Sequence, residues 1–442
     1  MHAEGDNVTA EVVPIGGDAP VRSMQSALLA AARKLYWFGC VMVPLLIVRV
    51  GSVTISDAMF SLSLLIAVLA HAGGDGRLPR PYAIGTFLGL ALIYALSTLA
   101  SSFGLPADDF IESLFAAGKF VYLLVFWFSL GVFVLRDERD IGMAALMWVI
   151  GVAISALGGI AQILIDPAIV PGTEVRIGRA VGFAEHPNDL GASSGIALGP
   201  AVALAAGALR FRLGRWLSGL CVPVIGIGLV LSASASGIIA AMLSVAFWLV
   251  GAARYRLALF SLGVVVVAII GLGIFIQTTD VDVHAIADLY ALADSGKTGT
   301  FAERIQTYVA ALDYVSSSPL VGVGTAAGGR AVWDGLAVHN VIIGAWYETG
   351  LLGCLAVIGM YGMACWLSVS AIRLSKGDPL RELLMALVGA ELAFLIYSLS
   401  APGLYQRYGW ISVALCIAAL NVLVRRRRRE HQLNPATGSE DQ

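Results

Sequence analysis

The sequence predicts an all-α, polytopic membrane protein with about 12 transmembrane helices. Hydrophobic residues make up 58% of its 442 residues, and charged residues only 13%. Apolar runs close to the ~20 residues that cross about 30 Å of hydrocarbon recur along the chain, whereas a β-barrel would show alternating segments of about 10 residues. These runs fall at 35–51, 53–70, 83–101, 113–135, 141–165, 189–209, 216–233, 236–252, 257–277, 340–371, 382–400 and 408–424.

Basic residues are distributed unequally between the two faces that such spans create. Of the 28 Lys and Arg residues, 20 are assigned to the face that carries both termini and 7 to the opposite face, with Lys119 left inside a span. Cytoplasmic loops of membrane proteins carry an excess of Lys and Arg. We therefore expect a multi-pass protein of the bacterial inner membrane with both termini in the cytoplasm.

The chain is predicted to divide into a transmembrane domain and two polar tails. Residues 1–34 are expected to form a disordered cytoplasmic tail, because no short apolar stretch with a cleavage site marks a signal peptide. Residues 35–424 form the transmembrane domain, and residues 425–442 form a basic anchor followed by a disordered tail. Arg425–Arg429 suits an anchor at anionic head groups. The five cysteines lie in apolar runs without a CxxC pair, which indicates neither disulfides nor a zinc site.

Two loops on the face opposite the termini, 166–188 and about 278–338, are longer than the others. The second, predicted to be periplasmic, contains an amphipathic helix that should lie against the membrane surface, because its apolar residues recur at helical spacing. These residues are Phe301, Ile305, Tyr308, Leu312 and Val315. Ser316–Pro319 ends the helix, and residues 322–328 are predicted to form a flexible turn before the next span.

Four cationic or titratable side chains of these loops point to chemistry at the outer membrane surface. Arg176 and Arg179 precede the span at 189–209, Arg304 lies on the amphipathic helix, and His339 begins the span at 340–371. Guanidinium groups bind phosphate oxygens through paired hydrogen bonds and stay charged in a partly dry site, which suits a pyrophosphate. A neutral imidazole beside them could take a proton from a hydroxyl, and the cations would lower its pKa.

Each of these residues also has a plain structural interpretation. Arg304 alone could be a solvated residue of a helix face, and His339 alone an interfacial side chain. His186, in the segment EHPND, resembles a histidine at a helix start more than a second base. The functional hypothesis depends on two loops bringing arginine and histidine to one face together.

Other motifs give weaker signals. Gly322, Gly324 and Gly328 do not form GxGxxG, and no P-loop, GxSxG or HExxH is present, so we expect no nucleotide cofactor and no metal. Asp280 and Asp282 have DxD spacing, and Asp108 and Asp109 are adjacent, but both pairs stand in ordinary polar loops. Lys119 lies inside the span at 113–135 and needs a partner.

The order of several motifs resembles the bacterial O-antigen ligase and polysaccharide polymerase superfamily. An Arg-x-x-Gly-Phe…Pro-Asn block is followed by a Ser-rich span, then by Glu-Arg, Pro-Leu-x-Gly-x-Gly, His-Asn and Glu-x-Gly-Leu-Leu-Gly. The residues that carry these motifs are Arg179, Gly182, Phe183, Pro187, Asn188, Ser232–Gly237, Glu303, Arg304, Pro319, Leu320, Gly322, Gly324, His339, Asn340, Glu348 and Gly350–Gly353. The resemblance covers roughly residues 180–355. Family members often have Ser-Arg-Gly where this chain has Ser-Ala-Ser-Gly.

The resemblance implies a GT-C-like fold and a glycosyltransferase that needs no metal and no nucleotide sugar. It implies transfer of a glycan from undecaprenyl pyrophosphate to a hydroxyl of a saccharide or lipid A-core acceptor at the periplasmic face. Arg179 and Arg304 would then hold the donor pyrophosphate, helped by Arg176, and His339 would activate the acceptor. Supporting roles would fall to Asn340, Glu348, Asn188 and His186. Ligase and polymerase activities both stay open.

The expected surroundings are membrane lipids and other envelope polysaccharide assembly proteins, with no nucleic acid. No pair of acidic residues stands out on the outer face, which disfavours a retaining two-carboxylate mechanism and favours direct, inverting displacement. The rival hypothesis is a transporter or flippase for lipid-linked sugars. Transporters are often built from inverted repeats, and the sequence shows no convincing internal repeat.

Overall fold

The structure, a computed structural model, describes residues 19–50, 53–72, 83–123, 127–173, 175, 178–208, 212–254, 301–325, 331–333 and 336–433. Its helices are α1 (Ala19–Met42), α2 (Ile55–Ala72), α3 (Ile84–Ser101), α4 (Ala107–Val121), α5 (Trp127–Val134), α6 (Glu138–Leu164), α7 (Pro187–Ala205), α8 (Arg212–Leu231), α9 (Ala235–Gly251), α12 (Phe301–Ser317), α14 (Val341–Leu374), α15 (Arg381–Ser398), the short η2 (Gly403–Tyr405) and α16 (Arg407–Leu433). Two antiparallel hairpins join β1 (Arg49–Val50) to β2 (Val53–Thr54) and β3 (Ala331–Trp333) to β4 (Leu336–Ala337).

The prediction of an all-α membrane protein is confirmed. Within the described residues, 6 helices are long and apolar enough to cross a membrane, namely α2, α3, α6, α8, α14 and α16, and α9 is a shorter apolar helix. Every predicted span overlaps a helix, except the span at 257–277, which lies outside the described residues. The total of twelve crossings and the GT-C-like topology stay predictions.

Three predicted boundaries differ from the structure. The run at 113–135 forms two helices, α4 and α5, and a π-type turn at Tyr122–Leu123 follows α4. Such turns let a helix redirect a side chain, and Tyr122 here donates a hydrogen bond to the Asp57 carbonyl oxygen at 3.1 Å. The first helix already begins at Ala19, because residues 24–34 are rich in strong helix formers, and α16 continues beyond the basic anchor to Leu433.

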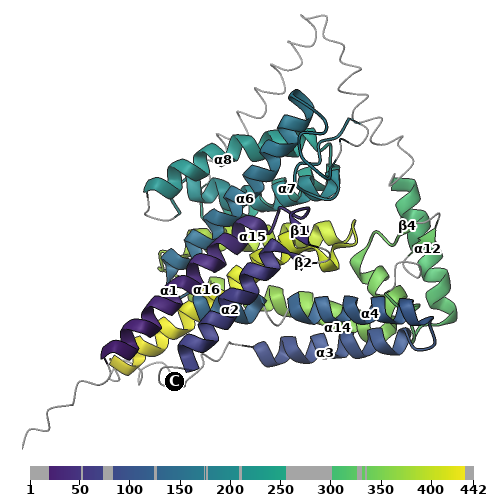
Figure 1. The fold of residues 1–442 in the computed structure, drawn as a ribbon, viewed down its shortest axis with the longest axis horizontal. Coiled ribbons are helices and arrows are strands. Elements are labelled where there is room, and N and C mark those ends of the chain that lie inside the picture. Colours follow the sequence, from purple (N-terminus) through teal and green to yellow (C-terminus); the bar gives the residue numbers. More distant parts are fainter. Residues whose placement is uncertain are drawn as a thin grey trace, which may run out of the picture.

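Charged residues gather at one end of the bundle, where α1 begins and α16 ends (Figure 1). Arg33 pairs with Asp140 at 3.2 Å, and Arg426 pairs with Glu138 and, at 2.6 Å, with Asp378. These arginines all belong to the face that the sequence predicts to be cytoplasmic, so the structure groups them as expected. Part of the basic anchor therefore packs against protein carboxylates.

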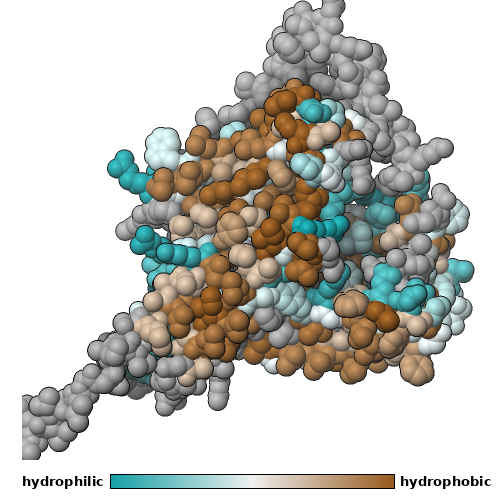
Figure 2. Space-filling view, viewed as in Figure 1, coloured by the Kyte–Doolittle hydropathy of each residue, from teal (hydrophilic) through white to brown (hydrophobic). Residues whose placement is uncertain are grey.

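The opposite end of the bundle carries α12 and the β3–β4 hairpin (Figure 1). Apolar side chains cover α8 and α3, whereas polar side chains gather around a hollow that faces α12 (Figure 2). Since a membrane-embedded surface must be apolar, the polar hollow marks the water-facing part of this end.

Close helix packing places the first turns of α7 and α9 side by side. A Cβ atom on Gly195 would lie 2.2 Å from the Gly237 carbonyl oxygen, and one on Gly191 would lie 2.3 Å from the Ser234 Cβ. Small residues let helix backbones approach in this way. The two helix starts consequently border one site.

The central helix, α16, is fixed at its start by a charged pair. Arg407 donates hydrogen bonds to Asp57 of α2 from Nε at 3.1 Å and from a terminal nitrogen at 2.8 Å. Thr54 donates from its hydroxyl to the same carboxylate at 2.8 Å. This contact also fixes residues 399–406, which connect α15 to α16.

The long apolar run at 340–371 forms a single helix with a break at Gly350, whose φ is +72°. The segment before α14 fills the break. The Val323 amide donates to the Tyr347 carbonyl at 3.0 Å, and the Gly324 amide donates to the Glu348 carbonyl at 2.9 Å. A Cβ atom on Gly322 would lie 2.3 Å from the Glu348 carbonyl carbon, so glycine is needed for this close approach.

The predicted flexible turn at 322–328 is therefore wrong over residues 322–324. A helix break leaves backbone carbonyls that need hydrogen-bond donors, and this segment supplies them. Residues 326–328 lie outside the described residues.

The helix predicted in this loop is present as α12, but its inward face differs from the expected apolar face. Ala311 and Val315 are buried against the start of α14, together with the apolar part of Tyr308. Ile305 and Leu312, predicted to share that face, are 39% and 43% exposed. Apolar residues thus lie on both faces of α12, and its contact with the membrane surface stays a prediction.

We expect a cysteine placed at Ser317, an exposed residue at the end of α12, to react with a membrane-impermeant maleimide in intact cells. The reason is the 20-to-7 distribution of basic residues, which predicts that this end faces the periplasm. The unsubstituted chain gives the background from native cysteines. Reaction only after lysis would contradict the predicted orientation.

Candidate functional site

A cavity of about 230 Å³ lies between α12, α15 and the starts of α7, α9 and α14. It brings together four of the predicted site residues from two distant parts of the chain: His186 and Asn188 from one, and Arg304 and His339 from the other. Its lining residues are His186, Asn188, Asp189, Ser236, Arg304, His339, Tyr397, Ser400, Ala401, Pro402 and Gln406. Because Arg304 and His339, which the sequence predicts to be catalytic, meet here, we call this candidate site the catalytic pocket.

Three helices direct their N-terminal ends at the catalytic pocket. Each start is capped by a side chain that accepts backbone hydrogen bonds: His186 caps α7, Ser234 caps α9 and Asn340 caps α14. The N-terminus of a helix carries a partial positive charge and favours a bound anion. Together with the Arg304 guanidinium, these helix ends make the pocket suited to a negatively charged group.

His339 is held in one orientation by three contacts around it. Its Nδ1 lies 2.8 Å from the Ala337 carbonyl oxygen, and its own carbonyl accepts a hydrogen bond from the Tyr308 hydroxyl at 2.8 Å. The following residue, Asn340, caps α14 and donates from its side chain to the Leu399 carbonyl at 3.0 Å. With Nδ1 donating to a carbonyl, a neutral imidazole leaves its Nε2 lone pair for a proton.

The surroundings of His339 keep it neutral. Burial and, next, the Arg304 charge lower the pKa of His339 below its ordinary value, while the Ala337 hydrogen bond and Glu303 act weakly in the opposite direction. The prediction that nearby cations lower this pKa is confirmed for Arg304, although burial contributes more. A neutral, oriented imidazole is the form that a general base requires.

Arg304 brings a partly buried cation to the same pocket. Among the described residues, no acceptor bonds its Nε, which is buried. A buried guanidinium nitrogen left without an acceptor is costly. The anion-favouring helix ends and this nitrogen therefore point to one class of ligand, a phosphate-like anion.

Arg179 lies behind the lining of the pocket. Its Nε donates to the Ser232 carbonyl at 2.8 Å, and a terminal nitrogen donates to the Asn188 side-chain oxygen at 2.5 Å. Asn188 lines the pocket, and both Arg179 and Arg304 interact electrostatically with Tyr397 in its wall. Arg179 thus adds positive charge and positions Asn188.

The other predicted site residues divide into helix caps and residues away from the pocket. The Nδ1 of His186 accepts from the Asn188 amide at 3.1 Å, which uses the lone pair that a second base would need. Glu348 does not line the pocket, and its carbonyl instead closes the α14 break. Arg176, Asp280 and Asp282 lie outside the described residues.

Seven residues of the pocket wall were not among the predicted site residues: Asp189, Ser236, Tyr397, Ser400, Ala401, Pro402 and Gln406. The Asp189 carboxylate accepts a hydrogen bond from Tyr408 at 3.0 Å. Asp189 could have been inferred from its place directly after Asn188 in the first turn of a helix. Ser236 stands in the Ser-rich motif Ser232–Gly237, and the other five have no local sequence signal.

Comparison with known proteins agrees with this geometry. Residues 220–358 match the model of the family Wzy_C, described as O-antigen ligase. The matched region includes Arg304, His339, Asn340 and the α14 break, whereas Arg179, His186 and Asn188 precede it. No curated protein matches the chain.

Proposed function

We propose, from the premise that residues 220–358 of this membrane-embedded chain are an O-antigen ligase domain, that the protein is a lipid-linked glycan transferase. It would move a saccharide from undecaprenyl pyrophosphate to an acceptor hydroxyl at the periplasmic face of the inner membrane. The proposal depends on one observation: an oriented, neutral histidine and a buried arginine nitrogen, which has no acceptor among the described residues, belong to the same pocket.

In this reaction the cations would bind the donor and stabilise the leaving group. Arg304 and the N-terminal ends of α7, α9 and α14 would surround the pyrophosphate, with Arg179 adding charge from behind Asn188. Positive groups fixed in advance stabilise the charge that develops as the pyrophosphate departs. The donor is already activated as a phosphate ester, so positioning the donor and the acceptor contributes much of the catalysis.

His339 would act as the general base. Its Nε2 takes the proton from the acceptor hydroxyl as that oxygen forms a bond to the anomeric carbon. The bond from that carbon to the pyrophosphate oxygen breaks, and the lipid pyrophosphate leaves with the electron pair. Attack opposite the leaving group inverts the anomeric carbon. Among the described residues, Asp189 is the one carboxylate in the pocket wall, and it binds Tyr408, which disfavours a two-carboxylate mechanism.

An in vitro transfer assay tests the proposal directly. The purified full-length protein is incubated with an undecaprenyl-pyrophosphate glycan and with either lipid A-core or a second lipid-linked glycan as acceptor. Mass spectrometry of the products then distinguishes a ligase from a polymerase. Movement of the lipid-linked glycan across vesicles without any new glycosidic bond would contradict the proposal and favour a flippase.

The pH dependence of transfer should report His339. Because the neutral imidazole is the active base, kcat/KM falls as the pH falls through the lowered pKa of His339. Arg304→Ala removes one cause of the lowered pKa, so the acid limb of its residual activity should move to higher pH. Arg179→Ala is the matched control, since Arg179 is not among the groups that shift His339. An acid limb that stays in place in Arg304→Ala would contradict this assignment.

A further inference from the structure

A second and larger cavity, of about 480 Å³, adjoins the catalytic pocket. It lies between α4, the β1–β2 hairpin and the start of α16, and Gln406 lines both cavities. We call it the α4 pocket, and define it by Glu112, Phe115, Lys119, Glu185, Tyr405 and Gln406. The catalytic pocket, at about 230 Å³, is smaller than the ≈ 300–1,000 Å³ of usual ligand sites, so substrates must extend beyond it.

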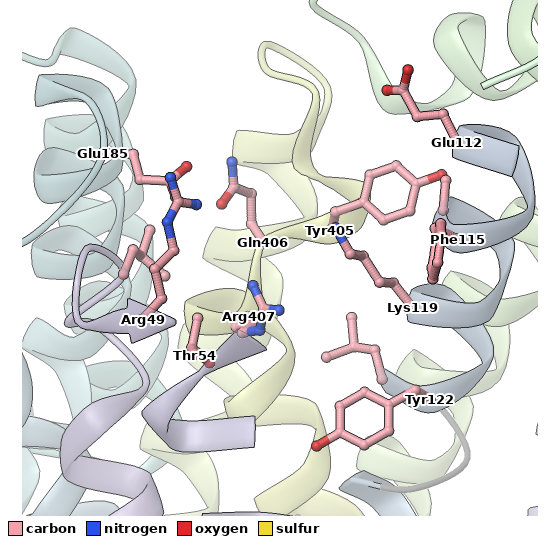
Figure 3. A pocket seen from close by; sticks show the side chains of 13 residues that line it. Arg49, Thr54, Glu112, Phe115, Lys119, Tyr122, Glu185, Tyr405, Gln406 and Arg407 are labelled. Atoms are coloured by element: carbon pink, nitrogen blue, oxygen red, sulfur yellow. The ribbon is translucent and has the colours of Figure 1, made fainter. Parts of the chain in front are cut away.

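Most of the cations at the α4 pocket are already neutralised. Arg407 binds Asp57 through two hydrogen bonds, and Arg49 binds Glu185. Among the described residues, Lys119 forms no salt bridge, and Figure 3 shows it reaching from α4 toward Tyr405. Glu112 and Glu185 line the same space. With both arginines paired and the charge of Lys119 balanced by that of Glu112, the α4 pocket has no excess positive charge for a pyrophosphate. It therefore differs from the catalytic pocket in the ligand that it suits.

The remaining groups suit a polyhydroxylated ring. Phe115, Tyr122 and Tyr405 present aromatic side chains (Figure 3), against which the C–H face of a sugar can pack. Carboxylates and the Gln406 amide can accept from its hydroxyls, while the Lys119 ammonium and the Gln406 amide can donate to them. Aromatic walls with a few placed polar groups are typical of small-molecule sites.

We infer that the α4 pocket is a saccharide subsite, which holds the glycan of one substrate while its reacting end lies in the catalytic pocket. The inference is carried by Gln406, which lines both cavities and so places them side by side. The inference rests on the proposed function for its role in transfer, but the binding itself does not require catalysis. Lys119, unexplained by the sequence alone, thereby gains a role as a donor to sugar oxygens.

The test is a binding measurement on the full-length protein in detergent. The probe is the mixture of oligosaccharides that mild acid releases from the envelope glycan of the native host, titrated calorimetrically. Glu112→Gln and Phe115→Ala should each weaken its binding about tenfold or more. The first variant loses a hydrogen bond to a charged group, and the second loses part of the aromatic wall. Leu114→Ala is the control, because Leu114 is 48% exposed on the same helix and does not line the pocket.

Inorganic pyrophosphate serves as the second probe. Lys119→Ala should weaken oligosaccharide binding and leave pyrophosphate binding unchanged. The reverse pattern would make the α4 pocket a phosphate site and overturn the inference. Unchanged oligosaccharide affinity in both Glu112→Gln and Phe115→Ala would overturn it equally, as would a wild-type protein that binds no oligosaccharide.

Steady-state transfer then identifies the source of the sugar. A raised KM for the lipid-linked donor in Phe115→Ala assigns the subsite to the donor glycan, and a raised KM for the acceptor assigns it to the acceptor. The same binding titration on His339→Gln measures oligosaccharide binding in a variant that should not transfer glycan. It therefore tests the saccharide subsite separately from the proposed function. Wild-type binding without any transfer by the native protein would contradict the proposed function alone, whereas transfer with unaffected binding in the α4 variants would contradict the inference alone.

Discussion

His339→Ala is expected to lower the rate of glycan transfer about 10²–10⁴-fold while the protein still inserts into the membrane and still binds the donor lipid. The imidazole has its Nδ1 bound to the Ala337 carbonyl and lies beside Arg304 in the catalytic pocket. Removing it takes away the group that accepts the hydroxyl proton, but leaves the cations that bind the donor. The measurement is single-turnover transfer per folded molecule, with donor binding titrated in parallel.

His339→Gln distinguishes the catalytic role from a structural one. Glutamine can keep a hydrogen bond to Ala337 and preserve the start of α14, but its amide cannot take a proton at neutral pH. It should therefore be as inactive as the alanine variant. A near-normal rate for His339→Gln would mean that the residue only orders this loop. His186 could not readily replace it, because the Nδ1 of His186 caps α7.

The sequence predicted Arg304 and His339 because each is a polar side chain in a mainly apolar part of the chain. Arg304 and His339 are polar residues next to apolar runs on the face predicted to be periplasmic, and polar groups at such positions are usually kept for a purpose. Their meeting in one pocket agrees with their place in one loop, between the predicted spans at 257–277 and 340–371. The number of crossings and the orientation of the termini stay predictions.

Other parts of the site depend on packing that the sequence does not reveal. Gln406 reaches the pocket because Arg407 binds Asp57, a contact between residues 350 positions apart. Glu348 was expected to support catalysis, yet it does not line the pocket, and its backbone carbonyl accepts a hydrogen bond at the α14 break. Gly350 and Gly322 form that break together, and hydropathy alone presents the same run as one continuous helix.

Arginine substitutions provide the second strong test. Arg304→Ala should reduce transfer roughly 10- to 100-fold, because a charge-assisted hydrogen bond in a partly dry site contributes about 1.5–3 kcal/mol and each 1.36 kcal/mol is tenfold in rate. Arg304→Lys should keep only part of the activity, since an ammonium lacks the paired donors of guanidinium. Asp313→Ala is the control on α12, because Asp313 is exposed and away from the pocket.

Arg179→Ala should cause a loss of similar size for a different reason. Its guanidinium holds the Ser232 carbonyl and the Asn188 side chain, so the variant loses charge near the pyrophosphate and also releases Asn188 from its place in the pocket wall. Asn188→Ala should reproduce the defect in the pocket wall while keeping the Arg179 charge. If donor affinity falls in Arg179→Ala but not in Asn188→Ala, the charge itself binds the donor. Wild-type rates from both Arg179→Ala and Arg304→Ala, at matched membrane levels, would contradict a pyrophosphate site formed by these two arginines.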